Sequence, residues 1–179
     1  METLSEMMEK YKDYTEDQFL REFPGPFLVS DAELQPGSDD FQTRTDDLTN
    51  LVKEVLAAPH KIADPSVRKV IAVKKKSSSS YENMITLGRT DNNDIVLKFG
   101  FISKFHAYFL RLPDGRYTIS DAESFNRTVV NSEPLKPHEK RQLEFGDRIT
   151  IGPLSFTYFP PRAFYDYFIK DGGKKSKET

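Results

Sequence analysis

The stretch 88–131 reads GRTDNNDIVLKFGFISKFHAYFLRLPDGRYTISDAESFNRTVVN, and it alternates short apolar runs with polar turns. Arginine, serine, lysine and asparagine recur at those turns, namely as Arg89, Ser103, Lys104, Asn126 and Asn131. A fixed guanidinium beside a hydroxyl and an amide is suited to holding a phosphate group rather than to breaking a covalent bond. The stretch therefore predicts an anion-binding site on loops between strands.

Further strand-like runs lie on both sides of this stretch, separated by Gly, Asn and Pro. Many short strands with such punctuation indicate an all-β sandwich. We therefore expect a mainly β protein, an antiparallel β-sandwich over residues 68–160. The expected strands are 70–73, 84–87, 94–98, 106–112, 116–120, 128–131, 148–151 and 154–159.

Residues 1–67 have a different pattern, and we expect them to form a helical extension and a polar linker. Thr3 and Thr15 each precede a Glu or Gln by three residues, which is the spacing of a capping box that opens a helix. Apolar residues at helical spacing predict another helix at 48–56. Between these helices, Phe27–Val29 fits either a short strand or a docking plug.

Residues 161–179 are expected to form a C-terminal helix and a disordered tail. Pro160 and Pro161 end the last strand and can open a helix over 162–169. The tail from Asp171 is small, polar and basic, so we expect it to fray.

Composition limits the partners. The 179 residues carry 26 Lys and Arg against 28 Asp and Glu, and the net charge of −2 gives no general attraction to nucleic acid or to an anionic membrane. The lysine run 74–76 beside four serines fits a solvated edge strand better than a nucleic-acid contact. Cys is absent, the three His lie far apart, and no apolar run approaches the ~20 residues of a membrane helix. We expect a cytoplasmic protein without a metal, a cofactor, a nucleic-acid partner or a membrane partner.

The ordered motifs of the opening stretch resemble the forkhead-associated (FHA) domain, a module that reads phosphothreonine. The pattern of that family runs Gly-Arg, Asn-Asp-Ile, Ser-x-x-His and Asn-Gly-Thr-x-Val-Asn-Gly, and nearly all of it recurs here in order. The resemblance implies that Arg89, Ser103 and Lys104 bind the phosphate. It also implies that Asn126 binds the main chain of the peptide.

The resemblance gives structural roles to the other matching residues. Gly88 suits a close approach of two chain segments. His106 would order the loops by hydrogen bonding, because no nucleophile with an acidic partner is visible around it. Thr128 and Asn131 would brace the loop that carries Asn126.

Three positions depart from the family pattern. Phe125 stands where the family often has a residue that can donate to the phosphate. Arg127 replaces a Gly, which costs ~1 kcal/mol if the backbone is left-handed there, although its cation could contact the ligand. Ser132 replaces the Gly of an Asn-Gly turn.

The expected function is that of a non-enzymatic phosphothreonine-peptide binding module, an adaptor in Ser/Thr kinase signalling. Its partner would be a threonine-phosphorylated protein, either a Ser/Thr kinase or a substrate of one. The alternative is an FHA-like scaffold that binds partners independently of phosphate, with Phe125 as an apolar contact. An enzyme with its chemistry in residues 1–60 is a third reading.

Two threonines of the polar linker, Thr43 and Thr45, are candidate phosphorylation sites. Some FHA proteins of similar layout bind their own phosphorylated N-terminal segment, and the linker is long enough to reach the sandwich. The resemblance therefore implies intramolecular binding as one option. The other reading makes Thr45 a helix cap and Thr43 an ordinary loop residue.

Overall fold

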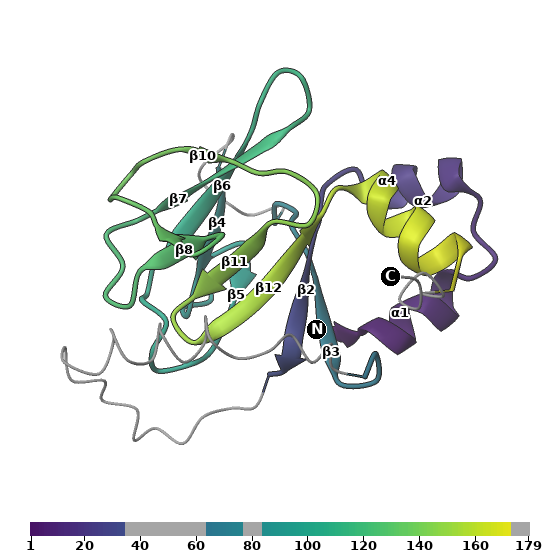
Figure 1. The fold of residues 1–179 in the computed structure, drawn as a ribbon, viewed down its shortest axis with the longest axis horizontal. Helices are drawn as coiled ribbons and strands as arrows, with labels where there is room; N and C mark the ends of the chain where they lie inside the picture. Colours follow the sequence, from purple (N-terminus) through teal and green to yellow (C-terminus); the bar gives the residue numbers. More distant parts are fainter. Residues whose placement is uncertain (35–63, 77–83, 173–179) are drawn as a thin grey trace.

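The computed structural model describes residues 1–34, 64–76 and 84–172, and within them two β-sheets pack face to face (Figure 1). Hydrogen-bonded neighbours run antiparallel, except β4 (Met84–Gly88) and β5 (Ile95–Val96), which run parallel. The first sheet has the order β1 (Glu2–Thr3), β3 (Arg68–Ala72), β2 (Phe27–Glu33), β12 (Leu154–Phe159), β11 (Arg148–Ile151), β8 (Thr128–Val130), β9 (Glu133–Pro134). The second sheet has the order β10 (Arg141–Gln142), β7 (Tyr117–Asp121), β6 (Ala107–Arg111), β4 (Met84–Gly88), β5 (Ile95–Val96). The predicted mainly antiparallel β-sandwich is confirmed.

The main core fills the space between the two sheets. Alternate residues of each strand point inward, so that Ile149 and Phe156 of the first sheet meet Leu87, Phe109 and Ile119 of the second, all without solvent exposure. Burial of such side chains contributes about 2 kcal/mol each, which makes this core the main source of stability. The loops at the ends of the strands are thereby held on a rigid frame.

Phe27–Val29 fits either a short strand or a docking plug by sequence, and the structure shows the strand. These residues begin β2, which lies inside the first sheet. It pairs with β12 on one side and with β3 on the other. Leu28 points into the core between the sheets, whereas Phe27 and Val29 point to the opposite face. Since β3 joins the sheet through β2, the sheet includes residues that precede the predicted range 68–160.

A second apolar cluster covers the outer face of the first sheet. Four short helical segments contribute to it, and Figure 1 shows them gathered beside β2 and β12. They are α1 (Leu4–Tyr11), α2 (Glu16–Glu22), α4 (Pro161–Phe164) and the π-helix η1 (Tyr165–Lys170). Both predicted capping boxes are present, at Thr3 and Thr15. Phe19 and Phe164 stack in the centre of this cluster with no solvent exposure.

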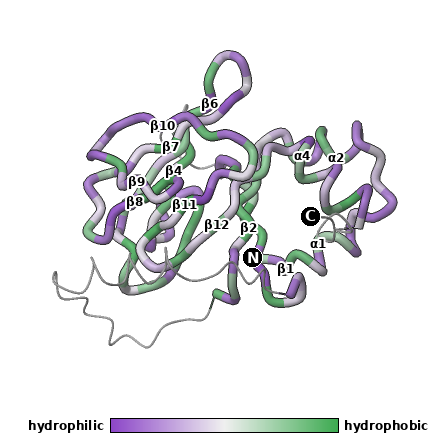
Figure 2. Tube along the Cα trace, viewed as in Figure 1, coloured by the Kyte–Doolittle hydropathy of each residue, from purple (hydrophilic) through white to green (hydrophobic). Residues whose placement is uncertain are grey.

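Hydropathy follows this architecture (Figure 2). Hydrophobic residues gather along the strands of the two sheets, and the connections around β8, β9 and β10 are largely hydrophilic. In the described ranges, no helix is long and apolar enough to cross a membrane. The predicted helix 48–56, as well as Thr43 and Thr45, fall outside the described residues.

Candidate functional site

The predicted site residues come from three loops that meet at one end of the sandwich, the lower end in Figure 1. The backbone N–H of Arg89 donates to the carbonyl of Ser103 at 3.0 Å, which joins the loop after β4 to the loop before β6. The backbone N–H of Phe125 donates to Ser103 Oγ at 3.1 Å, which adds the loop after β7. Ser103 is therefore the point where all three loops meet.

Gly88 is required by the close approach of two of these loops. A Cβ atom at this position would lie 2.2 Å from the carbonyl oxygen of Lys104 and 2.7 Å from Nδ2 of Asn93. No side chain can occupy that space without moving backbone. The expected role of Gly88, a close chain approach just before Arg89, is therefore what the geometry requires.

His106 lies fully buried between two loops and links them through both ring nitrogens. Its Nδ1 accepts the backbone N–H of Ser103 at 3.1 Å, so the proton sits on Nε2, which donates to the carbonyl of Arg127 at 3.1 Å. Burial lowers the pKa of His106, and this outweighs the carbonyl of Arg127 and the carboxylate of Asp121, which raise it. A buried neutral imidazole with both nitrogens engaged fits the predicted structural role and not a catalytic one.

The hydroxyl of Ser103 is placed to donate to an anion. Its oxygen already accepts the backbone N–H of Phe125, so its own hydrogen can rotate toward a ligand. The neighbouring Lys104 is exposed, and its carbonyl accepts hydrogen bonds from Asn93 at 2.7 Å and Thr90 at 3.0 Å. The backbone of this loop is thus fixed, while the two side chains face solvent.

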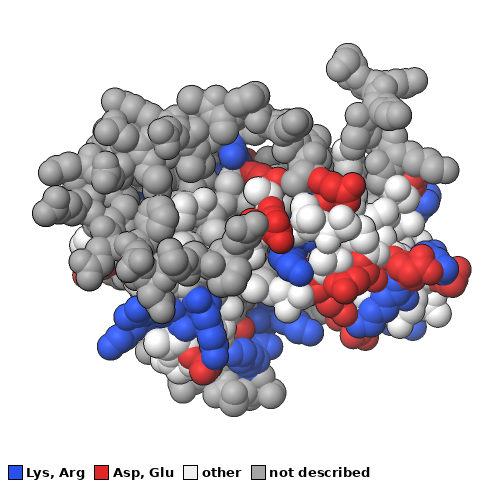
Figure 3. Space-filling model, turned by 90° about the horizontal axis from the view of Figure 1, so that it is seen from below, with Lys and Arg blue, Asp and Glu red and all other residues white. Residues whose placement is uncertain are grey.

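Three exposed cations lie on the loops that meet at Ser103. Arg89, Lys104 and Arg127 are exposed, and within the described part of the chain none of their side chains forms an ion pair or hydrogen bond. Figure 3, which views the molecule from below, shows Lys and Arg side chains gathered at the lower left, whereas both signs of charge alternate at the right. Unpaired cations around a hydroxyl are an arrangement that attracts a phosphate group.

The neighbouring side chains of Asn126 and Phe125 differ in their burial and in their hydrogen bonding. The Asn126 amide is buried, its Nδ2 donates to the carbonyl of Phe101 at 2.7 Å, and its Oδ1 has no hydrogen-bond partner among the described residues. Phe125 is 64% exposed. Peptide binding through the Asn126 side chain remains a prediction, and Phe125 adds an apolar surface beside it.

The backbone of this loop is left-handed at the two departures from the family's glycines. Arg127 has a φ of 62° and Ser132 a φ of 72°, a region that favours glycine. Asn131, with a φ of 49°, braces its turn by donating from Nδ2 to Asp147 and accepting the backbone N–H of Arg148. The predicted cost of Arg127 therefore applies to the observed conformation.

Sequence reasoning gave no role to Asp121, which organises the loop from within. This buried carboxylate accepts hydrogen bonds from the backbone and hydroxyl of Ser124 and from the hydroxyl of Thr128, at 2.5 to 2.9 Å. Thr128 is thus bonded to Asp121 within this part of the chain, and its predicted role as a brace of the loop remains a prediction. A single Asp at the end of a strand gives no sequence signal of this role, because it looks the same as a turn residue.

Metal ligands do not cluster in the described residues. They contain no group of three or more His, Cys, Asp or Glu side chains that could hold a metal ion. The structure thus brings together Arg89, Ser103, Lys104, Asn126 and Arg127, supported by Gly88, His106, Thr128 and Asn131.

Comparisons with known proteins agree with the motifs. The oxoglutarate dehydrogenase inhibitor of Corynebacterium diphtheriae is 28% identical over 142 residues, covering 71% of this chain and 96% of that protein. The glycogen accumulation regulator GarA of Mycolicibacterium smegmatis is 35% identical over 71 residues, covering 40% of this chain and 42% of that protein. The structure of EmbR of Mycobacterium tuberculosis with a low-affinity phosphopeptide is 31% identical, with a TM-score of 0.40, and covers 44% of this chain and 20% of EmbR.

This chain thus spans nearly all of one relative but less than half of the other two proteins. The model of a single family, described as the FHA domain, matches residues 85–152, the segment that contains every part of the site described above. Residues 85–152 of this chain are therefore similar to the forkhead-associated domain, as the order of the motifs predicts.

Proposed function

We propose that this chain is a phosphothreonine-peptide binding module that acts as a non-enzymatic adaptor in Ser/Thr kinase signalling. Its partner is a threonine-phosphorylated protein, either a kinase or a kinase substrate. The observation that carries the proposal is the set of exposed cations Arg89, Lys104 and Arg127 on the loops that meet at the hydroxyl of Ser103. A phosphate monoester carries close to two charges at pH 7 and three acceptor oxygens, which this set can satisfy.

The similar proteins support a regulatory role rather than catalysis. Two of them are named as an inhibitor and a regulator, and the third is described in complex with a phosphopeptide. The preference for threonine over serine rests on the resemblance of the motifs to the FHA family. The cytoplasmic location remains a prediction from the sequence.

A phosphopeptide library tests the proposal. Wild type should select phosphothreonine peptides over their unphosphorylated and phosphoserine forms, and Arg89→Ala should abolish the selection. Arg111→Ala is the matched control, because Arg111 is also exposed but lies next to the turn at the opposite end of β6. Selection that persists in Arg89→Ala, or that never depends on the phosphate, would reject phosphothreonine reading.

The second candidate is a scaffold that binds its partners independently of phosphate. The exposed ring of Phe125 and the internal hydrogen bond of the Asn126 amide favour it. This reading predicts that an unphosphorylated partner binds as tightly as the phosphorylated one. It also predicts that Phe125→Ser weakens binding more than Arg89→Ala does.

Intramolecular binding of the linker is a further part of the proposal. Glu33 pairs with Arg68, so the connection with Thr43 and Thr45 leaves and re-enters the first sheet at one point. β2 ends there beside the start of β12. Gly152, in the turn between β11 and β12, donates its backbone N–H to the carbonyl of Arg127 at 3.3 Å, so β2 ends at the same end of the sandwich as the site.

Phosphorylation by a Ser/Thr kinase tests this capture. We expect a chain phosphorylated at Thr43 or Thr45 to bind an external phosphothreonine peptide more weakly than the unmodified chain. Replacing both threonines by alanine should restore the affinity, whereas Thr49→Ala, the control, should not. Unchanged affinity after verified phosphorylation would exclude capture.

A further inference from the structure

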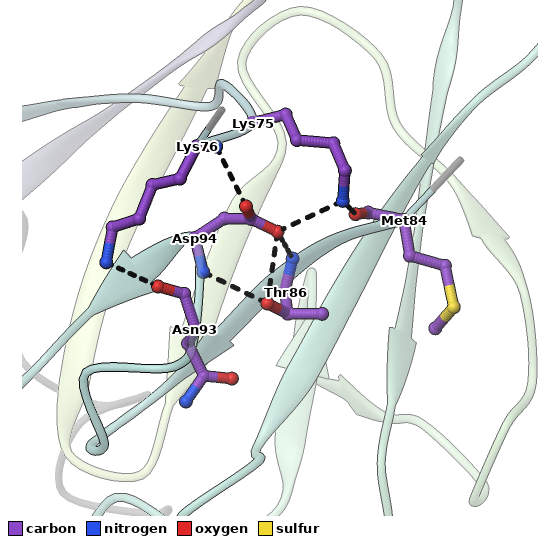
Figure 4. Close-up of polar contacts among 6 residues, drawn as sticks. All are labelled: Lys75, Lys76, Met84, Thr86, Asn93 and Asp94. Carbon is purple, nitrogen blue, oxygen red and sulfur yellow. Dashed lines mark hydrogen bonds and ion pairs between the residues drawn. The ribbon is translucent and has the colours of Figure 1, made fainter. Parts of the chain in front are cut away.

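Polar contacts join the segment after β3 to the loop that carries Arg89 (Figure 4). The backbone N–H of Lys76 donates to Asp94 Oδ1 at 2.8 Å. The ammonium of Lys76 donates to the carbonyl oxygen of Asn93 at 2.5 Å and to that of Asp91 at 3.3 Å. One lysine thus holds two carbonyl groups of this loop from outside the site.

Asp94 is the buried centre of these contacts. Its Oδ2 accepts the backbone N–H of Thr86 at 2.8 Å and the Thr86 hydroxyl at 3.1 Å, and the ammonium of Lys75 lies 3.6 Å away. Burial raises the pKa of the Asp94 carboxyl, but the hydrogen bonds from Thr86 and Lys76 and the charge of Lys75 together hold it below its ordinary value. The charged carboxylate therefore ties the segment after β3 to β4 and β5.

Asn93 holds the other side of the same loop. Its Nδ2 donates to the carbonyl of Lys104 at 2.7 Å and to that of Thr90 at 2.9 Å. The loop is therefore fastened to the phosphate-site loop on one side and to Lys76 on the other. Since the side chain of Arg89 has no partner among the described residues, this backbone sets the point and direction from which its guanidinium extends.

We propose that Lys76 is a positioning residue of the phosphothreonine site: its ammonium braces the loop 89–94 and holds Arg89 in place for the phosphate. The proposal rests on the proposed function, because it gives Lys76 an indirect part in the same site. An Arg89 whose backbone is already held in place loses less conformational freedom when the ligand binds. Lys76 therefore raises the affinity for the phosphopeptide without contacting it. Lys76 belongs to the lysine run 74–76, and as a brace it has a structural role rather than that of a free cation.

Methionine substitutions test the brace, because they keep the apolar stem and remove the ammonium. Lys74 is the matched control: it is exposed, and its side chain has no partner within the described ranges. The probe is the tightest phosphothreonine peptide from the library, titrated calorimetrically. We expect Lys76→Met to weaken binding about fivefold, as for the loss of one net hydrogen bond. Lys74→Met should stay within about twofold of wild type, and Lys76→Arg, which keeps the donors, should bind as wild type does.

The salt dependence of the same titrations separates a brace from a direct contact with the phosphate. A direct ion pair is screened by salt, so its removal would leave a complex that is less sensitive to salt than the wild-type complex. A brace predicts equal salt sensitivity in Lys76→Met and wild type. A reduced sensitivity would overturn the proposal in favour of direct contact, and equal affinities of the two methionine variants would overturn it outright.

Amide hydrogen exchange provides a readout that needs no ligand. The N–H groups of Arg89 and Asn93 are bonded to the carbonyls of Ser103 and Thr90, so they report the order of this loop. We expect faster exchange of both in Lys76→Met than in Lys74→Met. Unchanged exchange would overturn the brace even if phosphothreonine binding is real. Faster exchange in a protein that binds no phosphopeptide would support the brace while rejecting the proposed function.

Discussion

At the scale of single residues, Arg127 combines a left-handed backbone with an exposed cation. Its φ of 62° is one that glycine adopts freely, whereas other residues lose roughly 1 kcal/mol there. Its carbonyl also accepts the hydrogen bond from His106 Nε2, so the strained backbone belongs to the structure of the site. A residue that is costly to the fold and exposes a cation on the loop after β7 is consistent with selection for binding.

Two substitutions at this position separate the two effects. We predict that Arg127→Gly has a free energy of unfolding about 1 kcal/mol higher than Arg127→Ala, because only glycine relieves the left-handed backbone. Both variants should bind phosphopeptide more weakly than wild type, and by the same factor, because both lose the cation. Urea unfolding and calorimetric titration measure the two quantities. Equal stability of the variants would show that the backbone there is not strained.

His106 makes stability depend on pH in a defined direction. Its ordinary pKa is 6.5 and burial lowers it in the folded chain, so the unfolded chain binds more protons just below pH 6.5. The free energy of unfolding should therefore fall as the pH is lowered from 6.5, until the pKa of the folded state is passed. Urea unfolding at pH 7.5, 6.5 and 5.5 measures the fall, and NMR titration assigns it to His106. A His106 ring that titrates at or above 6.5 would contradict this account.

At the scale of elements, β2 shows what sequence patterns can and cannot reveal. The capping boxes at Thr3 and Thr15 were predictable because a helix start is encoded within four residues. The short strands β9 and β10 were not predicted, since a two-residue strand exists only through its pairing partner. β2 remained ambiguous for the same reason: its apolar residues 27–29 fit a plug as well as a strand until β3 and β12 are placed beside them.

Truncation of one β2 side chain tests its place in the sheet. Leu28 is fully buried between the sheets, so Leu28→Ala should lower the free energy of unfolding by about 2–5 kcal/mol. Leu20→Ala in α2 is the control, because Leu20 is only partly buried and should cost less. Chemical denaturation measures both variants. A loss at Leu28 no larger than that at Leu20 would mean that β2 is peripheral.

At the scale of the whole molecule, two apolar clusters share the first sheet, and the proposed phosphate site lies at one end of the frame that they stiffen. The motif residues of the site could be found from the sequence, because their order along the chain is distinctive. Their support could not: Asp121 acts on residues nearby in the chain but looks the same as a turn residue, and Lys76 meets Asp94 only after folding. The net charge of −2 does not reveal a cationic site either, since that site depends on where a few cations are left unpaired.

The central claim is that Arg89 reads a phosphate, and a double-mutant cycle measures this directly. Wild type and Arg89→Ala are each titrated with one phosphothreonine peptide and with its unphosphorylated form, and the four dissociation constants give the coupling free energy between the guanidinium and the phosphate. The account predicts a coupling of about 2–4 kcal/mol, the loss expected when one partner of a charge-assisted pair is removed. A coupling near zero, with the phosphate adding the same affinity whether or not Arg89 is present, would contradict it.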